Sequence, residues 1–351
     1  MAIRLFLIAI LTMFPLMSKG DIVICSWNIQ NLGWNNNKRF DKVAHVANYC
    51  DFLAIQELMN ETALERLEQK VEATSGEAWS SMASHALGRS TYREHYAFLW
   101  RDSAVEYDSG AVVFIDHRDA FAREPYSAQF RSRRTGQAFA AATVHITYGS
   151  SIGDRLPEIE ALADYWQWLE EVYPGTPRLL LGDFNLRPQH AGWAPLRELG
   201  AIPAITEGAT TLGLTDDHYA NLYDNIWKIS GTLNVSERGI VLFPELFGIG
   251  HEWARDVVSD HAPVFITLGS ATLETNPSHG HTPHPAGAMS ACIDLNTASR
   301  ESLADLPHVG PARADAIVEL RPWEVLEDLS RISGLNHSRL KEIQGSGQLC
   351  D

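Results

Sequence analysis

Short apolar runs alternate with amphipathic stretches from residue 21 to residue 268, and no other feature of the sequence limits the fold as much. The runs favour strands, whereas the longer stretches have the apolar spacing of helices. Strand candidates are DIVICSW, FLAIQE, YAFLWR, GAVVFI, FAAATVHI, RLLLGDF, NIWKI and VFITL. Helix candidates lie near residues 38–49, 60–73, 155–172 and 190–199. About eight strands with interspersed helices predict an α/β layered sandwich.

The first twenty residues, MAIRLFLIAILTMFPLMSKG, have the character of an export signal. Arg4 precedes an apolar stretch that is too short to span a bilayer, and small residues precede Asp21. A buried helix or a single anchor is the alternative, which Pro15 and the short length disfavour. We therefore predict a signal peptide over 1–20 and a mature protein that is secreted or periplasmic, monomeric and without membrane contact.

The four cysteines fit an oxidising compartment, because an even number permits disulfides, here with three connectivities. Cys292 and Cys350 bracket the end of the chain, and we favour them as one pair. Cys25 lies inside a strand-like run and Cys50 precedes another, so these two are either bonded or simply buried.

The formal net charge is −16, and loss of Arg4 and Lys19 with the signal would make it −18. Proteins that hold nucleic acid by bulk charge are usually basic, so tight electrostatic binding is not expected. A hydrolase that needs a metal ion and a few arginines in one groove remains compatible with this charge.

Residues 271–290, ATLETNPSHGHTPHPAGAMS, differ in composition from both of their neighbours. They are rich in Pro, Gly, Ser and His and lack apolar periodicity, which is typical of a flexible linker. The histidines of this segment are either solvated or bind a metal adventitiously. The predicted organisation is a catalytic domain over 21–270, a linker over 271–290 and a small all-α domain over 291–351.

Polar residues cluster where the strand-like runs end, which is where open α/β folds place ligand sites. The residues are Asn28, Glu57, His145, Asp183, Asn185, Asp224, Asp260 and His261. A lone strand-end acid is more often a cap, and a lone histidine more often a satisfied core group. The set, however, contains what phosphodiester hydrolysis requires, namely oxygen ligands for Mg²⁺ and imidazoles with carboxylate partners.

Seven segments, in this order and spacing, resemble the endonuclease/exonuclease/phosphatase superfamily, and within it the secreted deoxyribonucleases of the pancreatic type. They are SWNIQNLG, IQEL, YREHYAFLWR, TVHI, LLLGDFN, YDNIW and SDHAPV. The resemblance covers residues 21–268. It implies a four-layered α/β sandwich of two packed mixed β-sheets flanked by helices, and an endonuclease that acts on DNA with Mg²⁺, or alternatively Mn²⁺.

The resemblance also implies roles for individual residues. Two of them would hold the metal, Asn28 and Glu57. Two carboxylate–imidazole pairs would flank the scissile phosphate, Glu94 with His145 and Asp224 with His261. Three further residues would position metal, phosphate or water: Asp183, Asn185 and Asp260, of which Asp260 is assigned to the metal. His261 would then be the base that activates water and His145 the acid.

Tyr92 and Arg123 match positions at which such nucleases touch the DNA backbone, ordinary surface residues being the alternative. Two departures from the family pattern bear on the substrate and the ions. Met59 stands where an arginine would reach into the minor groove, so DNA contact is expected to be weaker or arranged differently. Ser109 replaces an acid of a structural calcium site, which leaves a Ca²⁺ requirement open.

Residues 291–351 resemble the paired helix-hairpin-helix module of competence-type DNA-uptake proteins. In that motif a Gly-apolar-Gly turn offers backbone amides to a DNA phosphate. The turns here, PHVG and SGLN, keep Gly310 and Gly334, and His308 and Asn336 replace the other two glycines. With six Lys and Arg against ten Asp and Glu the segment has a net charge of −4. We predict DNA binding, with a folded interaction or stability module as the alternative.

The leading hypothesis is a secreted, metal-dependent endonuclease with DNA as its partner. The alternatives are a secreted sphingomyelinase-like phosphodiesterase on the same frame, and a non-catalytic DNA-binding or uptake protein. The absence of a long apolar insertion disfavours the lipid substrate.

Overall fold

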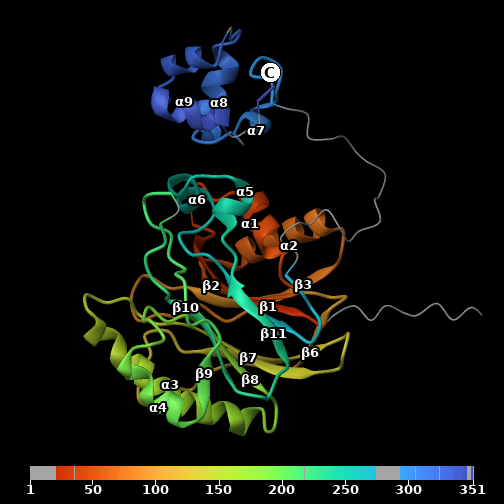
Figure 1. Cartoon of the computed structure of the whole chain (residues 1–351), viewed down its shortest axis with the longest axis vertical. Coiled ribbons are helices and arrows are strands. Elements are labelled where there is room, and N and C mark those ends of the chain that lie inside the picture. The colour runs from red at the N-terminus through yellow and green to blue at the C-terminus, as the bar shows by residue number, and fades with distance from the viewer. Residues whose placement is uncertain are drawn as a thin grey trace, which may run out of the picture.

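The computed structural model describes residues 21–34, 36–216, 218–273, 293–304, 306–323, 325–345 and 349–350. We call residues 21–273 the α/β region and residues 293–350 the helical module; Figure 1 shows the two one above the other. The signal peptide predicted over 1–20 and nearly all of the predicted linker lie outside the described residues. Within the described ranges, no helix has the length and apolar character needed to cross a bilayer.

The α/β region contains two six-stranded mixed sheets. The first has the order β11-β12-β1-β2-β4-β3, with β1 (Val23–Leu32), β2 (Phe52–Leu58), β3 (Trp79–Ala83), β4 (His95–Arg101), β11 (Val235–Ile240) and β12 (Val264–Leu268). The second has the order β5-β6-β7-β8-β10-β9, with β5 (Val105–Val113), β6 (Tyr126–Ser132), β7 (Ala138–His145), β8 (Arg178–Asp183), β9 (Ala201–Pro203) and β10 (Asp224–Ile229). In each sheet one central pair is parallel, β1 with β2 and β7 with β8.

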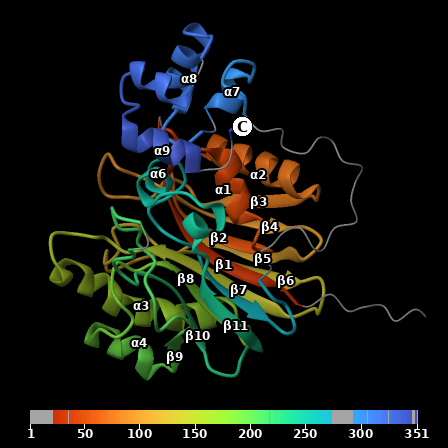
Figure 2. The same ribbon diagram turned by 45° about the horizontal axis from the view of Figure 1, so that its top comes forward.

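Helices cover the outer face of each sheet, as Figures 1 and 2 show. Against the first sheet lie α1 (Phe40–Ala47), α2 (Glu61–Ser75), α5 (Phe243–Phe247) and α6 (His251–Val257); against the second lie α3 (Ile152–Val172), η1 (Ala191–Trp193) and α4 (Ala194–Glu198). Separate apolar clusters fill the two helix–sheet interfaces and the space between the sheets. The predicted four-layered α/β sandwich is thus confirmed.

The alternation of side chains along the central strands carries polar groups to one end of the layer between the sheets. On β1, Ile24 belongs to the apolar cluster of this layer, and Asn28 lies four residues farther along on the same face. On β8, Leu181 packs in the cluster and Asp183 follows on the same face. Period-two alternation therefore makes the layer apolar along most of its length and polar at its mouth.

The eight strand candidates of the sequence correspond to β1, β2, β4, β5, β7, β8, β10 and β12. The strands β3, β6, β9 and β11 had not been predicted. Of these, β3, β9 and β11 lie at sheet edges, where a strand buries little and needs no apolar face. The sequence VSERGI of β11 shows this, since four of its six residues are polar or Gly.

The helical module has an apolar core of its own, which includes Leu306, Ile317, Trp323 and Leu340. Its helices are α7 (Arg300–Leu303), α8 (Gly310–Glu319), η2 (Leu326–Arg331) and α9 (His337–Gly345). The predicted all-α character is therefore seen in the described part of this segment.

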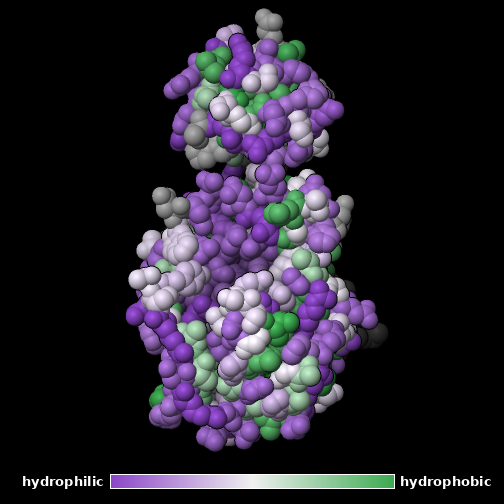
Figure 3. All heavy atoms as spheres, turned by 90° about the vertical axis from the view of Figure 1, so that its left-hand side faces the viewer, coloured by the Kyte–Doolittle hydropathy of each residue, from purple (hydrophilic) through white to green (hydrophobic). Residues whose placement is uncertain are grey.

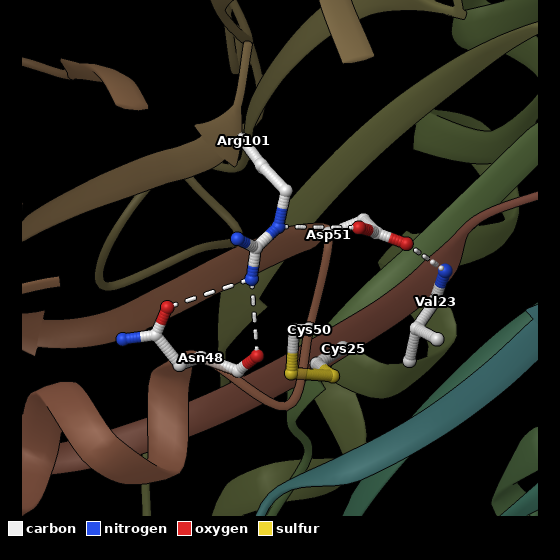
Figure 4. The surroundings of a disulfide bond; sticks show 6 residues. All are labelled: Val23, Cys25, Asn48, Cys50, Asp51 and Arg101. Carbon is white, nitrogen blue, oxygen red and sulfur yellow. Dashed lines mark hydrogen bonds and ion pairs between the residues drawn. A yellow bond between two sulfur atoms is a disulfide. The ribbon is translucent and has the colours of Figure 1, made fainter. Parts of the chain in front are cut away.

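A disulfide joins Cys25 of β1 to Cys50, two residues before β2 (Figure 4). Both cysteines are buried, and the bond closes a loop across 25 residues of sequence. Asp51 beside it accepts from the backbone of Val23 and faces Arg101 at 3.4 Å. Cys350 is also disulfide-bonded, whereas Cys292, its predicted partner, lies outside the described residues.

Replacing both Cys25 and Cys50 with alanine is expected to lower the free energy of unfolding by roughly 3–4 kcal/mol, because the unfolded chain regains the freedom that the loop closure removes. Denaturant titration of the variant and of the wild type would measure the loss. The variant titrated with a thiol reductant is the control, since it gives the separate contribution of the bond at Cys350. Equal midpoints for the variant and the wild type without reductant would contradict a stabilising role.

Candidate active site

A cleft of about 530 Å³ opens at the polar end of the layer between the two sheets. Its lining is mostly polar and includes Glu57, Tyr92, Arg123, His145, Asp183, Asn185, Arg255, Asp260 and His261. Eight of these nine positions were singled out in the sequence because they end strand-like runs or match motif positions; Arg255 is the exception. The cleft lies where the central strands end, as the sequence pattern predicted for a ligand site.

His261 and Asp224 form one carboxylate–imidazole pair across the two sheets. The Nδ1 of His261 lies 2.7 Å from Asp224 Oδ2, and both residues are buried. Asp224 begins β10 of the second sheet, whereas His261 precedes β12 of the first. The ring is held from behind as well, because its backbone N–H donates to Ser259 Oγ and its carbonyl accepts from the indole of Trp27. Nε2 is therefore the nitrogen that remains for chemistry.

His145 and Glu94 form the second pair, again across the sheets. Nδ1 of His145 lies 2.9 Å from Glu94 Oε1, and the carboxylate is fully buried. Glu94 immediately precedes β4 of the first sheet, and His145 ends β7 of the second. Arg123 completes the arrangement, since its Nε lies 3.1 Å from Glu94 Oε1 and its Nη2 donates to the carbonyl of His145.

Asp183 lies between the two imidazoles. Its Oδ2 is 3.6 Å from Nε2 of His145 and 3.7 Å from Nε2 of His261. The same oxygen accepts a hydrogen bond from Asn28 Nδ2 at 3.2 Å. Since the Nε2 atoms of both rings point toward one carboxylate oxygen, a group bound beside Asp183 could exchange protons with either ring.

These charges set the protonation of the site. Burial lowers the pKa of His261, but the carboxylates of Asp224 and Asp183 outweigh it and hold this pKa well above its ordinary value. Burial also lowers the pKa of His145, and Glu94 more than offsets it, so this pKa too is raised. Burial raises the pKa of Asp183, yet the two imidazoles reverse the direction and keep the carboxyl ionised.

The residues predicted to hold a metal meet only in part. Asn28 Nδ2 donates to Glu57 Oε1 at 2.9 Å, and the amide lies between the carboxylates of Glu57 and Asp183. An N–H donor between two carboxylates marks a point where positive charge is favoured, which fits a hard divalent ion with oxygen ligands. Asp260 lines the same cleft, but its carboxylate faces Arg255 at 3.7 Å.

Two further observations support a metal site in the cleft: the grouping of possible ligand atoms and the strained backbone of Glu57. Among the described residues, two groups have ligand atoms close enough to share an ion: Glu57 with Glu94 and His145, and Asp183 with Asp224 and His261. Asp260 belongs to neither group. Glu57 has φ +59° beside a register shift between β2 and β4, a left-handed conformation that is uncommon for Glu and turns its carboxylate out of the strand repeat.

Tyr92 and Arg123, predicted to contact DNA, both line the cleft. The hydroxyl of Tyr92 donates to Glu94 Oε2 at 3.3 Å, and its ring lies edge-on to Trp34. Arg123 is only 11% exposed at its side chain, because the ion pair with Glu94 draws it inward. Asn185, also predicted, has φ +49° and donates through its amide to the carbonyl of Ile146.

Sequence reasoning missed two buried residues of the site. Lys38 Nζ donates to Gln30 Oε1 at 3.0 Å and to the carbonyl of Val258 at 2.9 Å, which ties the end of β1 to the loop that carries His261. Burial lowers the pKa of Lys38 to about 8, against the opposing effect of Asp260 and Glu57. The surrounding NNNKR has no strand or helix period that could have revealed this lysine.

Gln56 is the second missed residue. It is fully buried on β2, and its Nε2 donates to Ser26 Oγ of the first sheet and to Thr143 Oγ1 of the second. Its place was readable in the sequence, because a polar residue in FLAIQE shares a face with Phe52 and Ala54. Gln56 forms a polar bridge just below the mouth of the cleft.

The two turns of the helical module are joined by Arg313. Its Nη1 donates to the carbonyl of His308 in the first turn, and its Nε donates to the carbonyl of Ser333 in the second. His308 takes φ +63°, so the first turn keeps a left-handed residue without glycine. Gly334 has φ +87°, and a Cβ there would collide with the Arg313 guanidinium.

Comparison with known proteins gives relatives along nearly the whole chain. A deoxyribonuclease of Thioalkalivibrio sp. (strain K90mix) is 50% identical over 354 residues, which cover 98% of this chain and 97% of that protein. Human deoxyribonuclease-1 is 29% identical over 277 residues, covering 71% of this chain and 92% of its own. A family described as the helix-hairpin-helix motif matches residues 290–346.

Solved structures support the fold of the α/β region. An endonuclease/exonuclease/phosphatase family protein from Bacteroides thetaiotaomicron has 17% identity and a TM-score of 0.52, covering 70% of this chain and 97% of its own. A protein of the same description from Bacteroides vulgatus has 18% identity and a TM-score of 0.53, covering 71% and 99%. At such identities the likeness shows the fold alone.

Proposed function

The chain belongs to the deoxyribonuclease family of the endonuclease/exonuclease/phosphatase superfamily, and on that premise we propose that it is an exported, divalent-metal-dependent endonuclease that hydrolyses DNA phosphodiester bonds. One observation carries the proposal. The Nε2 atoms of His145 and His261 approach the same oxygen of Asp183 at 3.6 and 3.7 Å, each ring being held at Nδ1 by a buried carboxylate. Hydrolysis needs one group to take a proton and another to give one on opposite sides of a phosphate, and this geometry supplies both.

His261 would act as the base. Asp224 fixes the ring by accepting at Nδ1, which leaves Nε2 to remove a proton from the attacking water. The imidazolium so formed lies between Asp224 and Asp183, whose charges stabilise it. The base step is thus favoured by the carboxylates on both sides of the ring.

His145 would act as the acid at the leaving oxygen. Glu94 raises the pKa of His145 above its ordinary value, which favours the protonated ring that can deliver a proton from Nε2. Arg123 beside Glu94 limits this rise, because its charge opposes a second positive charge on His145. The acid therefore holds its proton less firmly than the Glu94 contact alone would make it.

Glu57 and Asn28 would hold the divalent ion, with Asp260 nearby in the cleft. When bound, a hard cation such as Mg²⁺ offsets charge that develops on the phosphoryl oxygens. Mn²⁺ accepts the same oxygen ligands and would serve as an alternative.

Export is supported by the disulfide as well as by the first twenty residues. Disulfides such as Cys25–Cys50 persist in oxidising compartments and are rare in reducing ones. We therefore place the protein outside the cytoplasm, secreted or periplasmic, where extracellular DNA would be its substrate.

A plasmid-nicking assay beside a sphingomyelin hydrolysis assay, each with Mg²⁺ and with chelator, tests the proposal. Nicking that requires Mg²⁺, without lipid hydrolysis, is the expected result. Lipid hydrolysis would favour the phosphodiesterase alternative. DNA binding without cleavage under any metal would favour a non-catalytic binding or uptake protein.

Removing the helical module, by ending the chain after about Pro277, is expected to raise KM on long DNA and to leave the rate on short duplexes nearly unchanged. The module would hold DNA near the cleft and raise its effective concentration without touching the reacting atoms. Initial rates on plasmid and on short duplexes across a salt series measure the effect. If the truncated chain and the full chain have the same KM on plasmid and on short duplexes, the module is instead a partner-binding or stabilising domain.

A further inference from the structure

A groove of about 960 Å³ separates the helical module from the α/β region, and arginines dominate its charge. Four arginines line it, one from the α/β region and three from the module: Arg39, Arg313, Arg331 and Arg339. The acidic residues of its lining are Glu252 and Asp256, both from α6. A surplus of positive charge in one groove is unexpected in a chain with a net charge of −16.

The charge of the module is segregated by side. It has six Lys and Arg against ten Asp and Glu, yet three of those six cations line this groove and none of the acids that the structure describes in the module does so. A second cavity at the junction, of about 380 Å³, is instead lined by Asp216, Glu245 and Glu342. The junction between the two parts therefore has one basic and one acidic opening.

Two of these arginines, Arg313 and Arg331, are held in place by partners that carry no charge. Arg39 instead pairs with Asp41 at 3.1 Å, and Arg339 faces Glu252. Arg313 donates to the carbonyls of His308 and Ser333, and Arg331 donates to the carbonyl of Asp328 while its guanidinium lies over the ring of Trp323. Backbone carbonyls and aromatic rings carry no net charge, so these contacts orient the cations and leave their formal charge. Oriented guanidinium groups are well suited to phosphate oxygens.

Helix α6 connects the groove to the cleft. Arg255 on this helix lines the active-site cleft, whereas Trp253 and Asp256 line the groove. Among the described residues, Arg339 of the module faces Glu252 of α6 at 3.6 Å, and Arg39, which precedes α1, donates to the carbonyl of Ala304 at 2.6 Å. On the face drawn in Figure 3, a hollow surrounded by hydrophilic side chains lies directly below the module.

We propose that the groove between α6 and the helical module is a second binding site for the phosphate backbone of DNA, which receives the part of the duplex that extends beyond the cleft. This inference rests on the proposed function, because it takes DNA as the substrate. It goes further by assigning recognition to arginine side chains of both parts of the chain. The acidic opening at the same junction would repel this backbone and so favour the groove as the path of the DNA.

The salt dependence of binding tests the proposal. Each phosphate that a cation neutralises contributes about −0.9 to the slope of log affinity against log salt. The full chain carrying His261→Ala, to prevent cleavage, would be titrated with a fluorescent 24-base-pair duplex over a series of NaCl concentrations. Adding Arg331→Gln is expected to make the slope shallower by about 1 and to weaken binding at low salt by roughly threefold or more.

The matched control is Lys341→Gln in the same background. It removes the same charge from the same module, but Lys341 is exposed and does not line the groove. The control slope is expected to equal that of the background, and thermal unfolding of all three proteins would establish that they fold alike. A control that loses as much slope as the groove variant, or a groove variant that loses none, would overturn the proposal.

The wild-type chain separates this outcome from failure of the proposed function. If it nicks plasmid with Mg²⁺ while the groove variant binds like the control, only the groove assignment is wrong. If the wild-type chain cleaves no DNA, the proposed function itself is wrong, whatever the groove binds.

Discussion

Replacing either His261 or His145 with alanine is expected to reduce the rate of plasmid cleavage by at least about 10²-fold, a loss of about 2.7 kcal/mol of transition-state stabilisation. Each ring presents Nε2 toward Asp183 and is held at Nδ1 by a buried carboxylate. Because the two rings would serve one chemical step, the double variant should lose much less than the product of the two single losses.

His85→Ala is the matched control for this experiment, since His85 is exposed and lies outside the cleft. Folding of every variant would be checked by thermal unfolding. Near-normal cleavage by folded His261→Ala protein would exclude it as the base. Fully multiplicative losses in the double variant would separate the two rings into independent steps.

The pH dependence of the wild-type rate tests the assignment of His261 as the base. A base must be neutral to accept a proton, so the rate rises as pH passes the pKa of His261. Asp224 raises that pKa, and Asp224→Asn should therefore move the acid limb of the profile to lower pH as well as slow the reaction. A slower variant with an unmoved acid limb would show that another group controls it.

Glu57→Gln is expected to raise the Mg²⁺ concentration for half-maximal activity by at least about tenfold, because one charged oxygen ligand becomes a neutral one. Chelation of all divalent ions should abolish cleavage by the wild type. Nicking rates across a Mg²⁺ titration would measure the shift, with Glu65→Gln on the exposed face of α2 as the control.

The direction of the Glu57 effect distinguishes a ligand from a structural residue. Loss of a ligand is overcome by more Mg²⁺, so the maximal rate should be largely recovered. A lower maximal rate with unchanged Mg²⁺ dependence would place Glu57 in the fold rather than at the metal.

Strand-end residues were predictable from the sequence because alternation is a local property. Asn28, His145 and Asp183 follow apolar runs of the right period, and a parallel central pair brings such ends to one edge. Edge strands such as β11 were not predictable, since they bury too little to need an apolar face. The Cys25–Cys50 pair stayed open for a different reason, because burial and bonding leave the same pattern in sequence.

Contacts between residues that lie far apart in the sequence could not be predicted from it. The side chain of Lys38 is positioned only when β1 packs beside the loop before His261. Its hydrogen-bond partner in that loop, Val258, is 220 residues away in sequence. Arg123 was singled out as a DNA contact and lines the cleft, but its ion pair with Glu94, 29 residues earlier in sequence, was not predicted. Long-range electrostatics of this kind has no local signature.

Each carboxylate–imidazole pair takes its carboxylate from one sheet and its imidazole from the other, in opposite senses. The packing of the apolar layer between the sheets therefore controls the hydrogen-bond lengths of the site, and Gln56 adds a polar link between the two sheets. A cavity made deep in that layer, far from any substrate, would let the sheets shift and lengthen both pairs together. The rate of turnover therefore depends on how tightly the core between the sheets is packed. It should fall when that packing is loosened, before the chain unfolds.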